Sequence, residues 1–188
     1  MKVVDGVLTA ITRGRLVKLH DYNNDGEADF YEAFFNEDEP DKGWHAYNFD
    51  LEVGKDGSFY YGRTGGFSQW SVPGGVVKVS ADGKTSTVIG AGLRVPNGIG
   101  KLPDGRITLG DNQGTYVPAS KISITSPDAF HGAGSWVKHG DKYDPEKIVQ
   151  PIVYMPQDLD SSSGGQLWVE KDLSLIHISE PTRQPCIS

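Results

Sequence analysis

The sequence has little cysteine, no long apolar run and no excess of positive charge. Its single cysteine is Cys186, so neither a disulfide framework nor a thiolate metal site is expected. No apolar run approaches the roughly 18–20 residues of a membrane-spanning helix, so we expect no membrane span in the chain. A net charge of -7 disfavours nucleic acid and anionic membrane surfaces as partners, because both would repel the protein.

The end of the chain does not have the character of a protein segment. Residues 173–183 resemble the in-frame translation of the transposase adapter used to prepare DNA for short-read sequencing, and such scars are excluded from fold reasoning. We therefore predict a folded part at 1–172, the N-terminal fragment of a longer domain, and a non-native tail at 173–188. A genuine C-terminal strand is the alternative. No signal-peptide pattern follows Met1, so the compartment has to be inferred in another way.

The glycines and prolines separate short runs rich in Val, Ile and Tyr, which predicts many short strands and tight turns. Two Asp-Gly pairs, at 56–57 and 104–105, lie between such runs, and this is a strong hairpin signal. Their aspartates are 48 residues apart, and both segments follow the order strand, turn, strand, glycine. A period of about 40–50 residues is typical of β-propeller blades. A β-sandwich would explain the hairpins but not the period.

The predicted fold is therefore all-β: a partial β-propeller with about three blades, from a propeller of about six. The blades are expected at residues 1–35, 36–92 and 93–160. The third contains a long insertion at 128–150, and residues 166–169 would begin a fourth.

One acidic segment matches the calcium-loop pattern D-x-[DN]-x-[DN]-G-x₅-E. Its candidate metal ligands are Asp21, Asn23, Asp25, Asp29 and Glu32. The flanking runs predict strands rather than helices, so the segment is not an EF-hand. An acidic hairpin turn, in which Asx side chains bond their own backbone, remains the alternative.

A second polar segment covers residues 92–114. Arg94 offers a bidentate fork for a carboxylate, and Gly114 allows its backbone to approach a ligand closely. Oxygens for a metal or a sugar come from further residues: Asn97, Asp111, Asn112 and Gln113. Simple capping of the strand ends by these residues is the alternative. A third candidate is His45 in Trp44-His45-Ala46, either a general base at the mouth of the channel or a packed surface histidine.

These segments resemble the soluble quinoprotein glucose/sorbosone dehydrogenase family, most closely its sorbosone-dehydrogenase-like propellers. The motifs are GLRVPNGIGKLPDGRITLGDNQG (92–114), WHAYNFDLEVGKDGSFYYG (44–62) and the NGDG-type turn at 23–26. The chain departs from the family pattern at Val95, where asparagine is usual, and after His45, where Ala-Tyr-Asn replaces Asn-Gly-Gly.

The resemblance implies oxidation of a sugar or sugar aldehyde with PQQ and Ca²⁺, in the periplasm or outside the cell. It implies that His45 takes the hydroxyl proton while hydride passes to the quinone. Arg94 would contact the quinone or its carboxylates, and the Gln113-Gly114 backbone would help to hold the calcium. A cytochrome c is the electron acceptor that the family suggests.

Two other functions use the same residues. Asn97 and Asp111 also resemble the metal ligands of gluconolactonase-like propellers, in which a divalent cation activates water or polarises a lactone. A non-catalytic carbohydrate-binding propeller is the third possibility.

Overall fold

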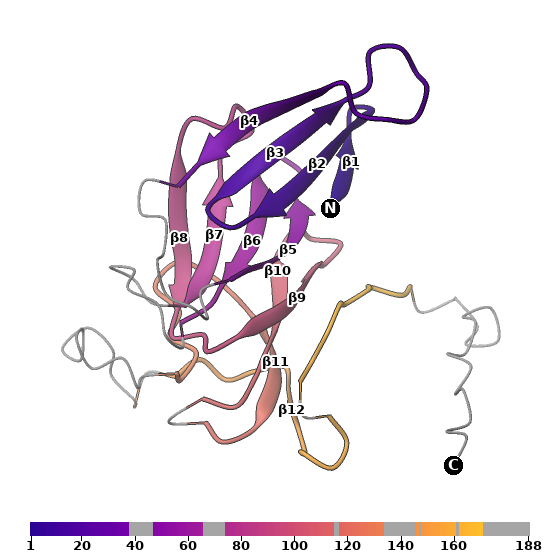
Figure 1. The fold of residues 1–188 in the computed structure, drawn as a ribbon. Coiled ribbons are helices and arrows are strands. Elements are labelled where there is room, and N and C mark those ends of the chain that lie inside the picture. The colour runs from indigo at the N-terminus through magenta and orange to yellow at the C-terminus, as the bar shows by residue number, and fades with distance from the viewer. Residues whose placement is uncertain are drawn as a thin grey trace, which may run out of the picture.

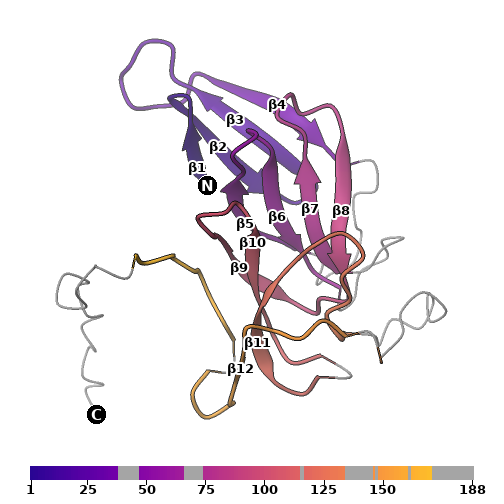
Figure 2. The same cartoon turned by 180° about the vertical axis from the view of Figure 1, so that it is seen from behind.

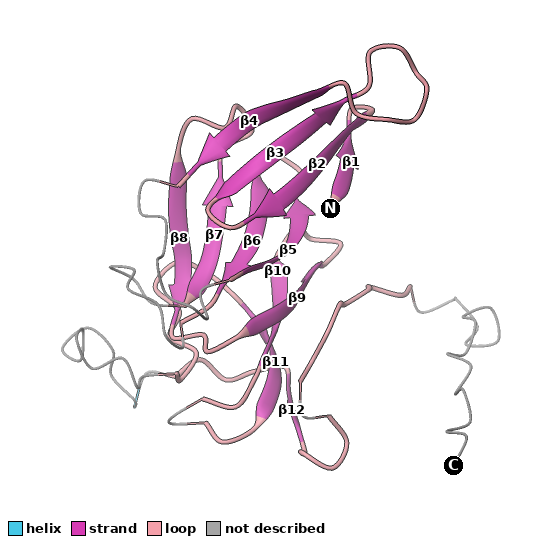
Figure 3. Cartoon of the chain, viewed as in Figure 1, coloured by secondary structure: helices cyan, strands magenta, loops and turns pink. Residues whose placement is uncertain are grey.

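The computed structural model describes residues 1–37, 47–65, 74–114, 117–133, 146, 148–160 and 162–170. This part of the chain forms twelve β-strands and contains no α-helix (Figure 3). It therefore offers no helix of the length and apolar character required to cross a membrane.

The strands form three separate four-stranded antiparallel sheets, and within each sheet the strands follow chain order. The first sheet contains β1 (Lys2–Val4), β2 (Val7–Thr12), β3 (Arg15–His20) and β4 (Phe30–Asn36). The second contains β5 (Asn48–Val53), β6 (Phe59–Arg63), β7 (Gly75–Val79) and β8 (Ser86–Ala91). The third contains β9 (Pro96–Lys101), β10 (Ile107–Asp111), β11 (Ser120–Ile124) and β12 (Val153–Met155). The sheets coincide with the three predicted units.

The two predicted Asp-Gly hairpins are confirmed. Gly57 turns between β5 and β6 with φ of 77°, and Gly105 turns between β9 and β10 with φ of 95°. Glycine adopts this left-handed region without the clash that a Cβ atom would cause.

The sheets pack face to face in sequence, as both views show (Figures 1 and 2). Every residue of β6 is buried. Because strand side chains alternate between faces, Tyr61 joins a core cluster with Leu16 of the first sheet, while Tyr60 joins a cluster with Leu109 of the third. Burial of each such large side chain stabilises the fold by about 1.5–3 kcal/mol.

The 48-residue period appears directly in the contacts between the second and third sheets. Lys101 Nζ donates to Val53 O, 48 residues earlier, at 2.5 Å. Ile99 N donates to Asp50 Oδ2, 49 residues earlier, at 2.8 Å. Equivalent positions of successive repeats thus meet where β5 packs against β9. The first strand of the second sheet therefore lies beside the first strand of the third.

The long insertion in the third sheet is confirmed as the connection between β11 and β12. Its described residues include Phe130, which makes isolated parallel bridges with Ala91 and Ile148. The insertion therefore extends the end of β8 and joins the second sheet to the third.

The predicted start of a further strand at 166–169 is not a strand in the structure. The segment nevertheless lies against β9, where Gln166 Nε2 donates to Gly98 O at 3.1 Å. A Cβ atom on Gly98 would lie 1.8 Å from Gly164 O. No strand among the described residues pairs with this segment, so it lacks the hydrogen-bond ladder that defines a strand.

Candidate functional site

The candidate residues of the second sequence motif gather at one end of the sheets, which we call the connector end. Here the first strand of a sheet begins beside the end of its second strand: Asn48 pairs with Arg63, and Pro96 pairs with Asp111. Gly65 N also donates to Arg94 O at 2.9 Å. The connectors that follow β6, β8 and β10 therefore meet at this end.

Asp111 is the centre of this end. Its side chain is fully buried. Oδ1 accepts the Val95 N–H at 2.9 Å and the Arg94 N–H at 3.1 Å. Oδ2 accepts from Lys121 Nζ at 3.1 Å, and that lysine is only 1% exposed. Burial raises the pKa of Asp111, while the Lys121 ammonium and the N–H groups of Arg94 and Val95 act in the opposite direction.

The half-buried Arg94 brings two of the predicted residues together, because its Nη1 donates to Gln113 O at 3.3 Å. A guanidinium has five N–H donors, so one bond to a carbonyl leaves others for an anionic ligand.

The other predicted residues of this motif lie close to Arg94 in the chain or in space. Asn97 lies in β9, and its O would be 2.8 Å from a Cβ atom on Gly110 in β10. Asn112 directly follows Asp111, and its Oδ1 is buried without a hydrogen-bond partner among the described residues. A Cβ atom on Gly114 would lie 2.8 Å from Gly132 O, so the absence of a side chain there allows the insertion to pack closely.

The predicted base His45 lies outside the described residues, as do Trp44 and Ala46. The chain is described again from Tyr47, whose N–H donates to Thr64 Oγ1 at 3.0 Å and whose O accepts the Thr64 N–H at 3.1 Å. Thr64 precedes Gly65, which bonds Arg94. The connector that contains His45 therefore returns to the sheets at the connector end, and the role of His45 stays a prediction.

The buried Tyr61 of β6 contacts Glu37, the first residue of the same connector after β4. The Tyr61 hydroxyl donates to Glu37 Oε1, which also accepts from Asn48 Nδ2 at 3.3 Å. Burial raises the pKa of Tyr61, and the nearby Glu37 carboxylate raises it further. Tyr61 is therefore a neutral donor that fixes Glu37 at the end of β4.

The sequence analysis did not identify Lys121 or His131 as part of this region. Along β11 the alternation of side chains puts Lys121 and Ser123 on one buried face, and the buried Thr125 directly follows the strand. His131 is fully buried, and its Nε2 lies 3.4 Å from Thr125 Oγ1. The sequence signal for this face is the two-residue spacing of Lys121, Ser123 and Thr125. Such spacing indicates that the three side chains share a face, but it does not indicate whether that face is buried or exposed to solvent.

His131 predicts a specific pH dependence of stability. Burial, and to a smaller extent the nearby Lys121 ammonium, lowers the pKa of His131 from 6.5 to about 4. As pH falls from 6.5 to 4, the unfolded state gains a proton before the folded state does. The contribution of neutral His131 to the free energy of unfolding should therefore be fully present above pH 6.5. The free energy of unfolding should then fall by roughly 3 kcal/mol between pH 6.5 and pH 4. Urea unfolding of the wild type and His131→Gln at several pH values measures this.

The His131→Gln variant should show a shallower decline than the wild type across this range. Identical declines in the wild type and His131→Gln would contradict a neutral buried His131.

The acidic segment connects β3 and β4 as a hydrogen-bonded loop. Asp21 accepts the Asn24 N–H at 2.6 Å and the Gly26 N–H at 2.9 Å. The Asp25 and Asp29 carboxylates also accept backbone N–H groups, and Asn23 Oδ1 accepts the Asp25 N–H. Glu32 Oε2 lies 2.8 Å from His20 Nε2. Among the described residues, no group of three or more His, Cys, Asp or Glu side chains is placed to hold a metal. Calcium binding by this loop stays a prediction.

Calcium binding by the loop would raise the free energy of unfolding, by about 2.7 kcal/mol at a Ca²⁺ concentration 100 times the Kd. Asp25→Asn should abolish this increase but keep the acceptor for the Glu27 N–H. Asp82→Asn, at an exposed turn outside the loop, should retain the increase. Thermal unfolding with Ca²⁺ and with a chelator measures it, and an equal increase in wild type and Asp25→Asn would exclude the loop as its source.

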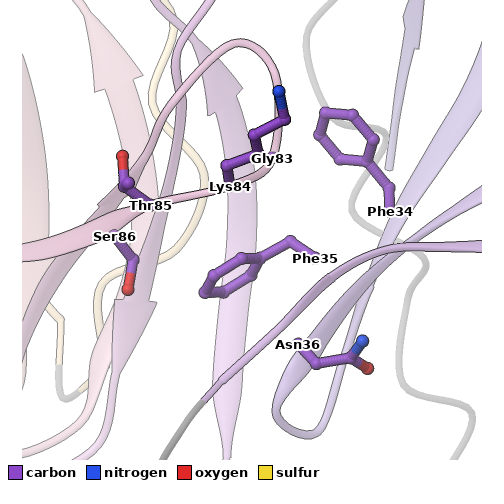
Figure 4. A pocket seen from close by; sticks show the side chains of 7 residues that line it. All are labelled: Phe34, Phe35, Asn36, Gly83, Lys84, Thr85 and Ser86. Atoms are coloured by element: carbon purple, nitrogen blue, oxygen red, sulfur yellow. The ribbon is translucent and has the colours of Figure 1, made fainter.

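A pocket in the described structure lies away from the connector end. It is lined by seven residues of β4, the β7–β8 turn and β8 (Figure 4): Phe34, Phe35, Asn36, Gly83, Lys84, Thr85 and Ser86. This pocket is at the start of β8, whereas Arg94 follows the end of β8, and it contains none of the candidate residues.

Comparison with solved structures identifies the architecture. The chain is similar to the PQQ-bound aldose sugar dehydrogenase from Streptomyces coelicolor, with a TM-score of 0.58 and 18% identity over 84% of this chain. The fold is that of a β-propeller. Three antiparallel four-stranded sheets in succession are three of its blades, and the match covers 50% of the dehydrogenase. The chain therefore spans about half the length of that structure.

A second solved structure, a structural-genomics target assigned to a gluconolactonase family, gives a TM-score of 0.45 with 18% identity. That match covers 69% of this chain and 48% of the other. No protein-family model matches the chain, and no curated protein sequence matches it.

The residues at the connector end of this propeller suit a carboxylate-bearing cofactor and a calcium ion. Arg94 supplies a cationic fork, and the Asn112 Oδ1 atom supplies a buried oxygen without a partner in the described part of the chain. The Gln113 carbonyl is a further oxygen. Oxygen donors are the ligands that Ca²⁺ prefers, and a guanidinium is well matched to a carboxylate.

Proposed function

We propose that this chain is part of a quinoprotein dehydrogenase that oxidises a sugar or sugar aldehyde with PQQ and calcium. The observation that carries the proposal is the position of Arg94: its backbone is fixed by Asp111 and Gly65, and its guanidinium lies against the Gln113 carbonyl. The likeness in fold to a PQQ-bound aldose sugar dehydrogenase supports the choice of cofactor and substrate class.

Each residue of the site has a defined role in this proposal. Arg94 binds a carboxylate or quinone oxygen of the cofactor, and Asn97 hydrogen-bonds the sugar. Asn112 Oδ1 and the Gln113-Gly114 backbone supply oxygens to the calcium. When bound, PQQ accepts the electrons of the substrate, and calcium polarises it as a Lewis acid. His45 takes the proton of the sugar hydroxyl.

The proposal extends to the whole propeller. Three large apolar or aromatic side chains at the third blade are exposed. The exposed fraction is 44% for Tyr154 in β12, and it is 86% for Leu167 and 54% for Trp168 after β12. A further blade would cover such a surface, and the match to half of a longer propeller supports this.

The sorbosone-like subgroup, a cytochrome c acceptor and a periplasmic or secreted location come from the family resemblance alone.

The experiment is reconstitution of the complete parent propeller, which contains this chain, with PQQ and Ca²⁺. We expect it to reduce an electron-accepting dye when an aldose is added, and to do so only when PQQ is present. Metal-dependent hydrolysis of a lactone without dye reduction would instead select the lactonase. Sugar binding without either reaction would select a carbohydrate-binding propeller.

A further inference from the structure

Asp111 was predicted as a direct ligand, but its geometry suits another task. It lies at the end of β10, where it pairs across the sheet with Lys121 on one side and with Pro96 on the other. Its exposure is 0% and that of Lys121 is 1%. Both carboxylate oxygens already accept protein donors within 3.2 Å. Contact with a ligand would require breaking these bonds.

The backbone N–H groups that donate to Asp111 belong to Arg94 and Val95, so these bonds restrain the chain around Arg94. The Arg94 and Val95 N–H groups lie in the connector before β9, outside any strand ladder. Asp111 therefore replaces the acceptors that a neighbouring strand would provide. On its other side, Arg94 O accepts the Gly65 N–H from the second blade. Because the N–H and the carbonyl group of Arg94 are both hydrogen-bonded, its backbone is fixed, and its guanidinium lies against the Gln113 carbonyl.

Lys121 makes this arrangement possible. A buried carboxylate without a cation is strongly disfavoured, and removal of one partner of a buried ion pair leaves the other uncompensated. The Lys121 ammonium supplies the compensating charge, because it lies 3.1 Å from Asp111 Oδ2 on the adjacent strand. In the described structure the side chain of Lys121 is too deeply buried to reach a ligand in solvent.

We infer that Asp111 and Lys121 are positioning residues: they form a buried ion pair that fixes the Arg94 backbone, and through it the guanidinium that binds the cofactor. The binding part of this inference rests on the proposed function. The backbone part does not, because it concerns only the contacts of Asp111.

The test uses Lys121→Met, which removes the charge but keeps an unbranched side chain. Backbone hydrogen exchange should accelerate about tenfold or more at the Arg94 and Val95 amides, with little change at Leu109 in the middle of β10. PQQ affinity should fall about tenfold, the loss expected for one hydrogen bond. Lys101→Met is the matched control, because Lys101 lies in the same blade but donates to Val53 O.

A double-mutant cycle with Arg94→Ala separates positioning from a general structural effect. If Lys121 acts through Arg94, Lys121→Met should weaken PQQ binding in the wild type but not in the Arg94→Ala protein. Equal weakening in both proteins would overturn the inference, as would unchanged exchange at Arg94 and Val95. If Lys121→Met does not fold, the neutral pair Asp111→Asn/Lys121→Met is used with the same criteria.

The two proposals fail in different ways. If the wild type does not bind PQQ, the proposed function fails, while the exchange rates at Arg94 and Val95 still decide whether Asp111 and Lys121 fix this backbone. If the wild type binds PQQ and Lys121→Met binds it equally well with the same exchange rates, only the positioning inference fails.

Discussion

Replacement of Gly74 with alanine is expected to destabilise the protein by at least about 3 kcal/mol. Gly74 has φ of 61°, and a Cβ atom built there would lie 1.8 Å from Leu93 O. Leu93 directly precedes Arg94, and a Cβ atom on Gly65 would also lie only 2.2 Å from the same oxygen. The two glycines thus allow the backbone of the second blade to pack tightly against the β8–β9 connector.

Urea unfolding of Gly74→Ala and Gly6→Ala separates the two sources of the effect. Gly6 has φ of 79°, but a Cβ atom there would meet nothing within 4 Å. Gly6→Ala should therefore show only the loss from the left-handed conformation, roughly 1–2 kcal/mol. If the two variants were equally stable, close packing of the connector against Gly74 would not be supported.

Replacement of His45 with alanine in the complete parent protein is expected to lower kcat by about 10²- to 10⁴-fold, the usual contribution of a general base. The connector containing His45 returns to the sheets at Tyr47, which bonds Thr64 next to the Gly65–Arg94 contact. The base is therefore expected at the same end of the propeller as the cofactor. Dye reduction with saturating aldose and PQQ measures the loss.

Imidazole in solution provides the control for His45→Ala. If the missing group is a proton acceptor, added imidazole should restore part of the turnover, and PQQ affinity should remain close to that of the wild type. A variant with unchanged kcat would exclude His45 as the base, and a loss that imidazole does not rescue would indicate a structural effect.

The fold was predictable because its signals are local and repeated. Asp-Gly turns and alternating strands follow from short-range chemistry, and the 48-residue spacing of Asp56 and Asp104 shows that these signals repeat along the chain. The structure converts that spacing into contacts such as Lys101 to Val53. Residues 166–169 were predicted to begin a fourth blade, but strand pairing could not be inferred there because it depends on a neighbouring strand.

The candidate site was only partly predictable. Proximity of Arg94 and Gln113 follows from their positions on connectors at the same end of neighbouring strands. The burial of Asp111 does not, because it depends on the register that pairs it with Lys121. A lysine in an alternating strand is ordinarily expected on the solvent side. Sequence reasoning therefore assigned Asp111 to ligand binding and gave Lys121 no role.

The most direct test of the account is the affinity of PQQ for the wild type and for Arg94→Ala, measured by equilibrium titration in the presence of Ca²⁺. Loss of charge-assisted hydrogen bonds should weaken binding about 10- to 100-fold. Arg106→Ala, which removes an exposed arginine bonded to Asp104, should bind PQQ as the wild type does. Equal affinities of the wild type and Arg94→Ala, or no binding by the wild type, would contradict a cofactor site built around Arg94.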